Sequence, residues 1–244
     1  MLGAAVEARR IVRNPAVGVK LPEIVAAPVV PLSAEQVWTL ADAASPALAA
    51  AVIVGAGLGL RQGEATGLTA DRIDWLAGRS VRVDRQLVTP ATGVPRLGPP
   101  KTKAAFRSVP ASDVVLDALA GHLKAHGTSE VWDASGRAVP GLVFHVGGRP
   151  IGRNRFGDLW RATVRRAGLP AGTRYHDLRH HFASGLIAAN CSVKAVQDAL
   201  GHASARETLD TYGHLWPADH DRIRAAVETT LARPPADKLR TADH

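Results

Sequence analysis

Apolar residues recur at helical spacing along most of the chain. Ser33, followed three residues later by Gln36, has the spacing of a capping box, which predicts that a helix begins there and runs to about residue 44. The alanine-rich apolar run 48–59 predicts a buried helix behind it. The same periodicity predicts further helices at about 112–126, 153–167, 176–189, 193–200 and 218–231.

Alternation of apolar and polar residues, which is typical of strands, is convincing in only one part of the chain. It covers 71–75, 80–88 and 105–109, with Gly and Pro between these stretches. We therefore predict a mainly α protein with a small antiparallel β-sheet, an α+β fold.

The two ends of the chain differ from this middle part. Residues 1–14 carry Val6, Ile11 and Val12 at helical spacing, and 14–31 holds four prolines without a stable period. We interpret 1–31 as the last helix of a preceding domain plus a linker, 32–232 as one domain, and 233–244 as a disordered tail.

Composition narrows the class of protein. The chain has 244 residues and is 46% hydrophobic, enough to fill a core, but its longest apolar run is too short to cross a bilayer. The amino terminus carries Glu7 and arginines rather than a signal peptide, so we expect a cytoplasmic protein. A single cysteine, Cys191, excludes an intramolecular disulfide.

A net charge of +8 favours a polyanionic partner, with nucleic acid as the first candidate. The basic residues are 24 Arg and 6 Lys, and a guanidinium can bind phosphate oxygens bidentately. Charge alone also fits a protein that is merely well solvated.

Two groups of polar residues lie close together in the second half of the sequence. His176 and Arg179 are three residues apart and share one face of the predicted helix. Gly201 lets the chain turn after the next helix and present His202, and Tyr212 follows ten residues later. Taken alone, a tyrosine here is more often a half-buried ring with a satisfied hydroxyl.

Two further groups lie earlier in the chain. Arg61 follows the buried helix, and Glu64 is placed to orient it. Lys101 and Lys103 stand at a turn before the strand 105–109. Singly, these residues fit an exposed ion pair and a solvated hairpin tip.

Together the series resembles the tyrosine recombinase or phage integrase family over about 32–231. The matching motifs are Gly-Leu-Arg61-x-Gly-Glu64, His176-x-Leu-Arg179-His180 and Leu-Gly-His202. The resemblance implies the fold of that family's catalytic domain and the catalytic set Arg61, Lys101, His176, Arg179, His202 and Tyr212. Lys103 is the alternative to Lys101. The family's usual gap before the tyrosine is nine residues rather than ten, and we expect a loop at 203–208 to absorb the extra residue.

The resemblance also implies a reaction that needs no metal and no other cofactor. Arg61 and Arg179 would clamp a DNA phosphate while Tyr212 attacks it to give a 3′-phosphotyrosine. His176 would accept the phenol proton, His202 would donate a hydrogen bond to the phosphate, and Lys101 would protonate the departing 5′ oxygen.

The implied partner is double-stranded DNA, bound by a tetramer on two duplexes that exchanges carboxy-terminal segments. The segment 218–231, with Ile223, Val227 and Leu231 in register, is the candidate for exchange, although it could also pack in cis. The expected phosphate contacts, for which a solvated basic face is the alternative, are Lys103, Arg107, Arg153 and Arg155.

Two other functions remain open at this stage. His176 and His180 have the i, i+4 spacing of zinc ligands, which would suit a metal hydrolase, but the sequence lacks a His-Glu-x-x-His motif. The chain could also be a truncated remnant that binds DNA without recombining it.

Overall fold

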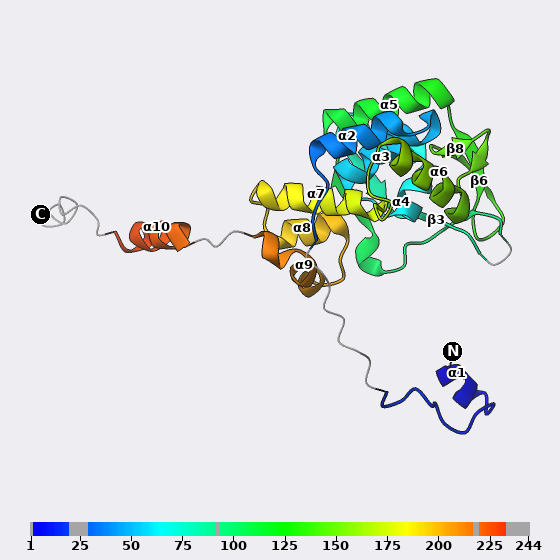
Figure 1. Cartoon of the computed structure of the whole chain (residues 1–244), viewed down its shortest axis with the longest axis horizontal. Coiled ribbons are helices and arrows are strands. Elements are labelled where there is room, and N and C mark those ends of the chain that lie inside the picture. The colour runs from blue at the N-terminus through cyan, green and yellow to red at the C-terminus, as the bar shows by residue number, and fades with distance from the viewer. Residues whose placement is uncertain (1, 20–28, 91–92, 217–219, 233–244) are drawn as a thin grey trace, which may run out of the picture.

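A buried helix, α3 (Pro46–Leu58), lies at the centre of the structure, a computed structural model that describes residues 2–19, 29–90, 93–216 and 220–232 (Figure 1). The predicted run 48–59 is confirmed as this helix. Its residues are apolar on every side, and Leu48, Val52, Val54 and Leu58 are fully buried.

Three helices pack around α3: α2 (Ala34–Ala43), α5 (Asp113–His126) and α7 (His176–Ala188). Glycines allow two of these approaches. A Cβ on Gly55 would lie 2.7 Å from the hydroxyl of Tyr175, and one on Gly57 would lie 2.3 Å from Cγ2 of Val115. The core of the domain therefore depends on the absence of side chains at two positions of α3.

The capping box predicted for α2 is confirmed. The Ser33 hydroxyl accepts a hydrogen bond from the Gln36 backbone N–H at 3.1 Å, and the Gln36 side chain accepts one from the Ser33 N–H at 2.9 Å. The remaining long helices also match their predicted ranges to within a few residues. They are α6 (Arg153–Arg166), α8 (Val193–Leu200) and α10 (His220–Leu231).

The predicted antiparallel sheet is present, in the order β1 (Ile73–Asp74), β2 (Ser80–Val83) and β5 (Arg107–Pro110). Val81 pairs with Ile73 on one side and with Val109 on the other, and both valines are fully buried. The stretch 80–88, however, divides into β2 and a separate strand, β3 (Gln86–Val88), which pairs with β4 (Arg96–Gly98).

The prediction of a single β region is wrong, because two more hairpins follow α5. Their strands have two to five residues each, and the longest of them contains both Pro and Gly, so that no alternation is visible in the sequence. The strands are β8 (His145–Val146), β9 (Arg149–Pro150), β7 (Ala138–Leu142) and β6 (Ser129–Trp132).

Short helices were also missed. The most consequential is α9 (Ala205–Tyr212), which occupies the segment expected to form a loop and begins at the N-cap Ser204. The others are α4 (Gln62–Thr66) and the 3-10 helices η1 (Ala70–Arg72), η2 (Lys103–Ala105) and η3 (Gly213–Leu215). α4 and the 3-10 helices have three to five residues, too few turns for a clear period, and α9 carries fewer apolar residues than the equally long α8.

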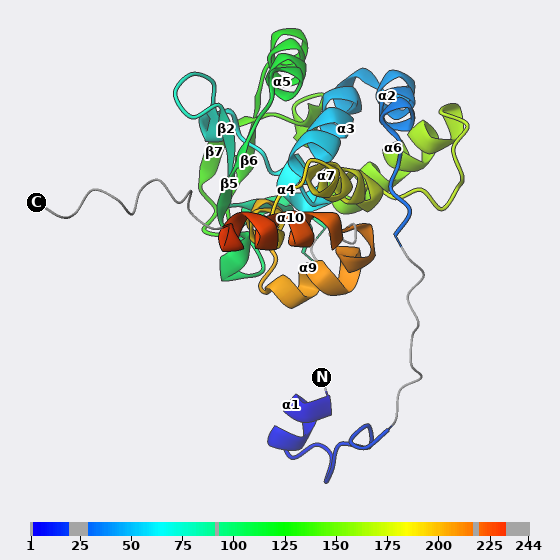
Figure 2. The same cartoon turned by 90° about the vertical axis from the view of Figure 1, so that its left-hand side faces the viewer.

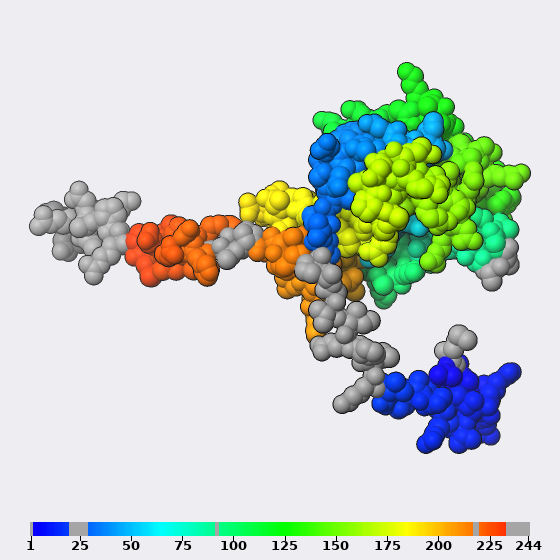
Figure 3. Space-filling model, viewed as in Figure 1, coloured from blue at the N-terminus to red at the C-terminus, as the bar shows by residue number. Residues whose placement is uncertain are grey.

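The terminal helices bury none of their residues. α1 (Leu2–Glu7) is shorter than the helix predicted over 1–14, and α10 exposes Ile223, Val227 and Leu231. α1 stands apart from the body in every view, and α10 stands apart in Figures 1 and 3, although it overlaps the body along the line of sight in Figure 2. Part of the predicted linker and the whole predicted tail, 233–244, lie outside the described residues.

None of the helices in the described part of the chain combines the length and the apolar character that a membrane span requires.

Gly55→Ala tests the close packing of α7 on α3. The added methyl must displace Tyr175, whose hydroxyl donates to the Ala51 carbonyl at 2.9 Å, so we expect the free energy of unfolding to fall by about 1–3 kcal/mol. Gly121→Ala is the matched control: it is also a helical glycine, has no atom near the added methyl, and should gain up to about 1 kcal/mol. Urea denaturation measures both, and a stabilising effect of Gly55→Ala would contradict this account.

Candidate active site

Three of the predicted site residues line one cavity of about 950 Å³. Arg61 precedes α4, Lys101 precedes η2, and His176 is the first residue of α7. Segments more than 100 residues apart in sequence therefore present their polar groups to the same space. The cavity's other basic residues are Arg153, Arg161 and Arg174.

The other three predicted residues are buried. Arg179 and Tyr212 are each 1% exposed, and His202 is 7% exposed. The charge of Arg61, whose side chain is 37% exposed, acts on all three of them. The six residues thus form an outer group that lines the cavity and an inner group that is buried.

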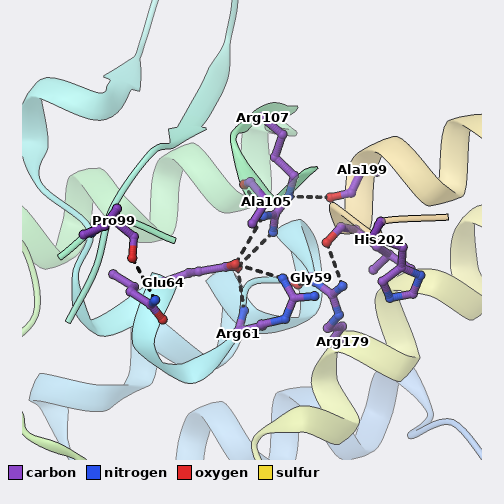
Figure 4. A network of polar contacts seen from close by, with 12 residues as sticks. Gly59, Arg61, Glu64, Pro99, Ala105, Arg107, Arg179, Ala199 and His202 are labelled. Atoms are coloured by element: carbon purple, nitrogen blue, oxygen red, sulfur yellow. Dashed lines mark hydrogen bonds and ion pairs between the residues drawn. The ribbon is translucent and has the colours of Figure 1, made fainter. Parts of the chain in front are cut away.

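Arg179 joins the carboxy-terminal ends of two helices. Its Nη1 donates to the Gly59 carbonyl at 2.7 Å, at the end of α3, and its Nη2 donates to the Leu200 carbonyl at 2.6 Å, at the end of α8 (Figure 4). Carbonyls at a helix end lack partners within the helix and carry partial negative charge. Burial and then the charge of Arg61 lower the pKa of Arg179 to about 9, so it stays protonated at neutral pH.

Glu64 orients Arg61, as expected. Its Oε1 accepts from Arg61 Nη1 at 3.0 Å and its Oε2 accepts from the Arg61 backbone N–H at 2.9 Å. The same carboxylate binds Arg107, whose Nη2 lies 2.9 Å from Oε2 and whose Nη1 lies 3.3 Å from Oε1. Burial alone would raise the pKa of Glu64, but hydrogen bonding and charge from Arg107, then from Arg61, lower it.

Arg107 therefore differs from its expected role as a surface contact to DNA. Its side chain is only 5% exposed, because β5 directs it inward to Glu64 rather than outward to solvent. Sequence alone gave no sign of this, since Glu64 lies 43 residues away.

Gly201 brings the corner that carries His202 against the lysine hairpin. Its φ of +66° is the left-handed conformation that favours glycine, and a Cβ there would lie 2.9 Å from the Ala104 carbonyl oxygen and 3.1 Å from Cα of Ala105. The Gly-His motif therefore has a second use besides ending α8. It lets two backbones touch.

His202 is held by residues of the following helix. Its Nδ1 is 2.9 Å from the Thr208 hydroxyl, and its Nε2 is 3.6 Å from Oε1 of Glu207. Burial and then the charge of Arg179 lower the pKa of His202 to about 4, so its ring is neutral at pH 7.

Tyr212, the last residue of α9, contacts two histidines. Its ring stacks on His202 with centroids 6.4 Å apart, and its hydroxyl is 2.8 Å from Nδ1 of His180. The expected partner of the hydroxyl was His176, which lies one turn earlier on α7 and contacts the His180 ring at 4.8 Å. Tyr212 belongs to the same buried apolar cluster as Ala183 and Ile187, which follow His180 on α7.

Of the residues 203–208 that were expected to form a loop, 205–208 belong to α9, and only 203 and 204 lie between His202 and this helix.

The remaining candidates separate into two groups. Lys101 and Arg153 line the cavity, whereas Lys103 begins η2 and is not among the lining residues. Arg155 lies beside a different cavity of about 370 Å³, because two residues along a helix correspond to a turn of about 200°. Arg161 could have been anticipated, since it follows Arg153 at i+8 on the same helix face.

The described residues do not gather three or more His, Cys, Asp or Glu side chains in a group that could hold a metal ion. His176 and His180 instead face each other and the arginines of the site. Burial, followed by the charges of His180 and Arg179, lowers the pKa of His176 to about 4.

The fold is shared with solved structures of recombinases. The Tn1549 transposon integrase (residues 82–397), in complex with circular intermediate DNA, has a TM-score of 0.72 at 24% identity, covering 93% of this chain and 76% of that one. The catalytic domain of bacteriophage HP1 integrase has a TM-score of 0.53 at 19% identity, covering 84% and 99%. The predicted α+β fold, that of a tyrosine recombinase catalytic domain, is thereby confirmed.

Sequence comparison gives the relationship directly. Tyrosine recombinase XerC of Rhodospirillum centenum is 35% identical over 181 residues, covering 72% of this chain and 44% of that protein. The XerC-like tyrosine recombinase of Caldanaerobacter subterraneus is 28% identical over 195 residues, covering 75% and 48%. The chain thus spans about half the length of these relatives. Because the model of the phage integrase family matches residues 31–218, most of the sequence, the chain belongs to that family.

Proposed function

We propose that this chain cleaves and rejoins DNA strands in site-specific recombination, through a covalent 3′-phosphotyrosine at Tyr212. The observation that carries the proposal is the convergence of six residues on one site: Arg61, Lys101 and His176 line the cavity, and Arg179, His202 and Tyr212 lie behind it. The relatives are named tyrosine recombinases and integrases, which supports the same activity here.

Electrostatics favour a phosphodiester as the substrate. Arg61, Arg107 and Arg179 surround one carboxylate, Glu64, so the network keeps a surplus of positive charge. A phosphate in the cavity would meet Arg61 directly, and the negative charge that develops on its oxygens during attack would be stabilised by both Arg61 and Arg179.

Double-stranded DNA is the partner that fits the rest of the cavity. Arg153, Arg161 and Arg174 line its walls and would bind further phosphates of the backbone. Lys103 would bind a phosphate near Lys101. Arg107 is not such a contact, because its side chain is buried against Glu64, and Arg155 would need DNA to reach a different face. A protein acting on bacterial or phage DNA would work in the bacterial cytoplasm.

In the proposed reaction the Tyr212 oxygen forms a bond to phosphorus while the bond from phosphorus to the 5′ oxygen breaks. Lys101 gives a proton to the departing oxygen, and His202 donates a hydrogen bond to the phosphate. The phenol proton passes to a histidine of α7. Attack by another 5′ hydroxyl reverses these steps and joins a new strand, so the energy of the phosphodiester bond is retained.

Two of the three histidines of α7, His176 and His180, are candidates to accept that proton. His180 holds the Tyr212 hydroxyl in the free protein, and His176 shares the cavity with Arg61. With a pKa of about 4, His176 is neutral at pH 7 but a weak base in the free protein, and the negative charge of a bound phosphate would raise this pKa. Since Tyr212 is 1% exposed, attack would also require α9 to move so that the hydroxyl reaches the phosphate.

For assembly, we propose a tetramer on two DNA duplexes, held in part by α10. The exposed Ile223, Val227 and Leu231 give this helix an apolar side that its own chain leaves uncovered among the described residues. A neighbouring subunit is the proposed occupant.

The tyrosines offer a test of how Tyr212 is held. Burial raises the pKa of Tyr212 to about 12, although Arg179 and Arg61 oppose the shift, and burial raises the pKa of Tyr175 even further. The chain has no other tyrosine. We therefore expect almost no phenolate absorbance at 295 nm near pH 10 in the folded protein, but a titration with its midpoint near pH 10 in urea. A tyrosine that titrates near 10 in the folded state, and is lost in Tyr212→Phe, would contradict the buried placement.

The central experiment uses duplex DNA with a nick beside the cleavage position of a cognate recombination site. Denaturing electrophoresis should show a covalent protein–DNA adduct that forms in EDTA and disappears in Tyr212→Phe. The phenylalanine variant should still bind the DNA, since only the hydroxyl is removed. DNA binding without any adduct from the unmodified chain would favour the binding remnant, and an adduct in Tyr212→Phe would exclude this nucleophile.

A DNA substrate with a different leaving group can show which of the two lysines protonates the departing 5′ oxygen. Lys101→Ala should slow cleavage by about 10²–10⁴-fold on ordinary DNA, and a 5′-bridging sulfur, which leaves without protonation, should restore most of the rate. Lys103→Ala is the matched control and should stay within about threefold. If the sulfur substrate rescues Lys103→Ala and not Lys101→Ala, the assignment is reversed.

A further inference from the structure

Arg107 is a buried arginine outside the six predicted catalytic residues, and it contacts three of the segments that carry them. Through Glu64 it reaches the segment of Arg61. Its Nη1 donates to the Ala105 carbonyl at 3.0 Å, in the hairpin of Lys101, and its Nε donates to the Ala199 carbonyl at 2.8 Å, three residues before His202 (Figure 4).

These contacts leave Arg107 little freedom. Its guanidinium makes four hydrogen bonds, two of them to the two oxygens of Glu64 in the bidentate arrangement that gives the strongest arginine–carboxylate pairs. Its Nη1 also lies 3.1 Å from the position that a Cβ on Gly201 would take. No flexible side chain separates it from either the hairpin or the Gly-His corner.

The charge of Arg107 also determines how much of the positive charge of Arg61 is neutralised by Glu64. Glu64 binds both arginines, and its side chain is 3% exposed, so water does little to stabilise its charge. With Arg107 present, two cations share one anion, and positive charge is left for a ligand in the cavity. Without it, Arg61 would be the remaining guanidinium on Glu64, and its charge would be neutralised inside the protein.

We propose that Arg107 is a positioning residue of the active site, which neutralises Glu64 so that Arg61 keeps its charge for the phosphate, and which fixes the Lys101 hairpin to the end of α8. The inference rests on the proposed function. It assigns Arg107 no contact with DNA, because its hydrogen bonds are directed to groups inside the protein.

The test compares three variants of the full chain with the unmodified protein: Arg107→Met, Arg107→Lys, and the double variant Glu64→Gln with Arg107→Met. Arg72→Met is the matched control. Arg72 is also a partly buried arginine that binds a carboxylate, that of Asp84 at 2.8 Å, but it does not line the cavity. Single-turnover cleavage at saturating nicked DNA is measured together with DNA affinity and thermal stability.

Arg107→Met should lower the cleavage rate at least 100-fold while changing DNA affinity less than about threefold. Arg107→Lys should lose about tenfold or more, because one ammonium, with three N–H donors on one nitrogen, cannot bridge the same four acceptor oxygens. The double variant should regain at least tenfold over Arg107→Met, since removing the unpaired carboxylate releases Arg61. A merely structural role predicts the opposite, namely a double variant that is no better than the single one. Arg72→Met should lose stability without a change in rate.

A second measurement does not depend on cleavage. In the Tyr212→Phe background, orthovanadate serves as a phosphate-like probe, and its affinity is measured by NMR titration. Arg107→Met should weaken vanadate binding about tenfold, and the added Glu64→Gln should restore it.

The two measurements distinguish the possible failures. If the unmodified chain forms no adduct with DNA, the proposed function fails while the vanadate series still tests Arg107. The inference itself is overturned if Arg107→Met cleaves within threefold of the unmodified protein, if the double variant shows no recovery, or if vanadate affinity does not change. Should Arg107→Met not fold, Arg107→Lys and the double variant give the same comparison.

Discussion

The carbonyl ends of α3 and α8 meet at the guanidinium of Arg179, and the rest of the site is arranged around this junction. Each helix would otherwise end in buried carbonyls without donors. α3 is the central helix of the core. Because Arg179 binds the ends of both α3 and α8, it fixes the corner that carries His202 relative to the core. Arg107 repeats the arrangement one residue earlier, at the Ala199 carbonyl, so that two arginines satisfy the end of α8.

A buried arginine of this kind combines two roles that are usually separate. Its hydrogen bonds satisfy backbone groups, as a cap does, and its charge remains unpaired by any carboxylate in the described contacts. Desolvation makes such a charge costly in the free protein. The same property makes it effective toward an incoming anion, because little water has to be displaced from around it when the anion binds.

Much of this organisation could be predicted from sequence. The long helices, the capping box at Ser33 and the β1–β2–β5 sheet follow from periodicity and local signals, and the six-residue set follows from motifs. What could not be predicted depends on contacts distant in sequence: the inward turn of Arg107 to Glu64, and the pairing of Tyr212 with His180. The strands after α5 were missed because two to five residues are too few to show a period, and α9 was missed because it has few apolar residues.

The burial of Tyr212 has a consequence for the fidelity of the proposed reaction. If the hydroxyl acts only when uncovered, the observed rate is the intrinsic rate multiplied by the fraction of molecules in the uncovered form. Tyr212 is 1% exposed, so the structure describes the covered form. Discrimination between sites can then come from how strongly a sequence favours the uncovered form, and two DNA sites of equal affinity could be cut at very different rates.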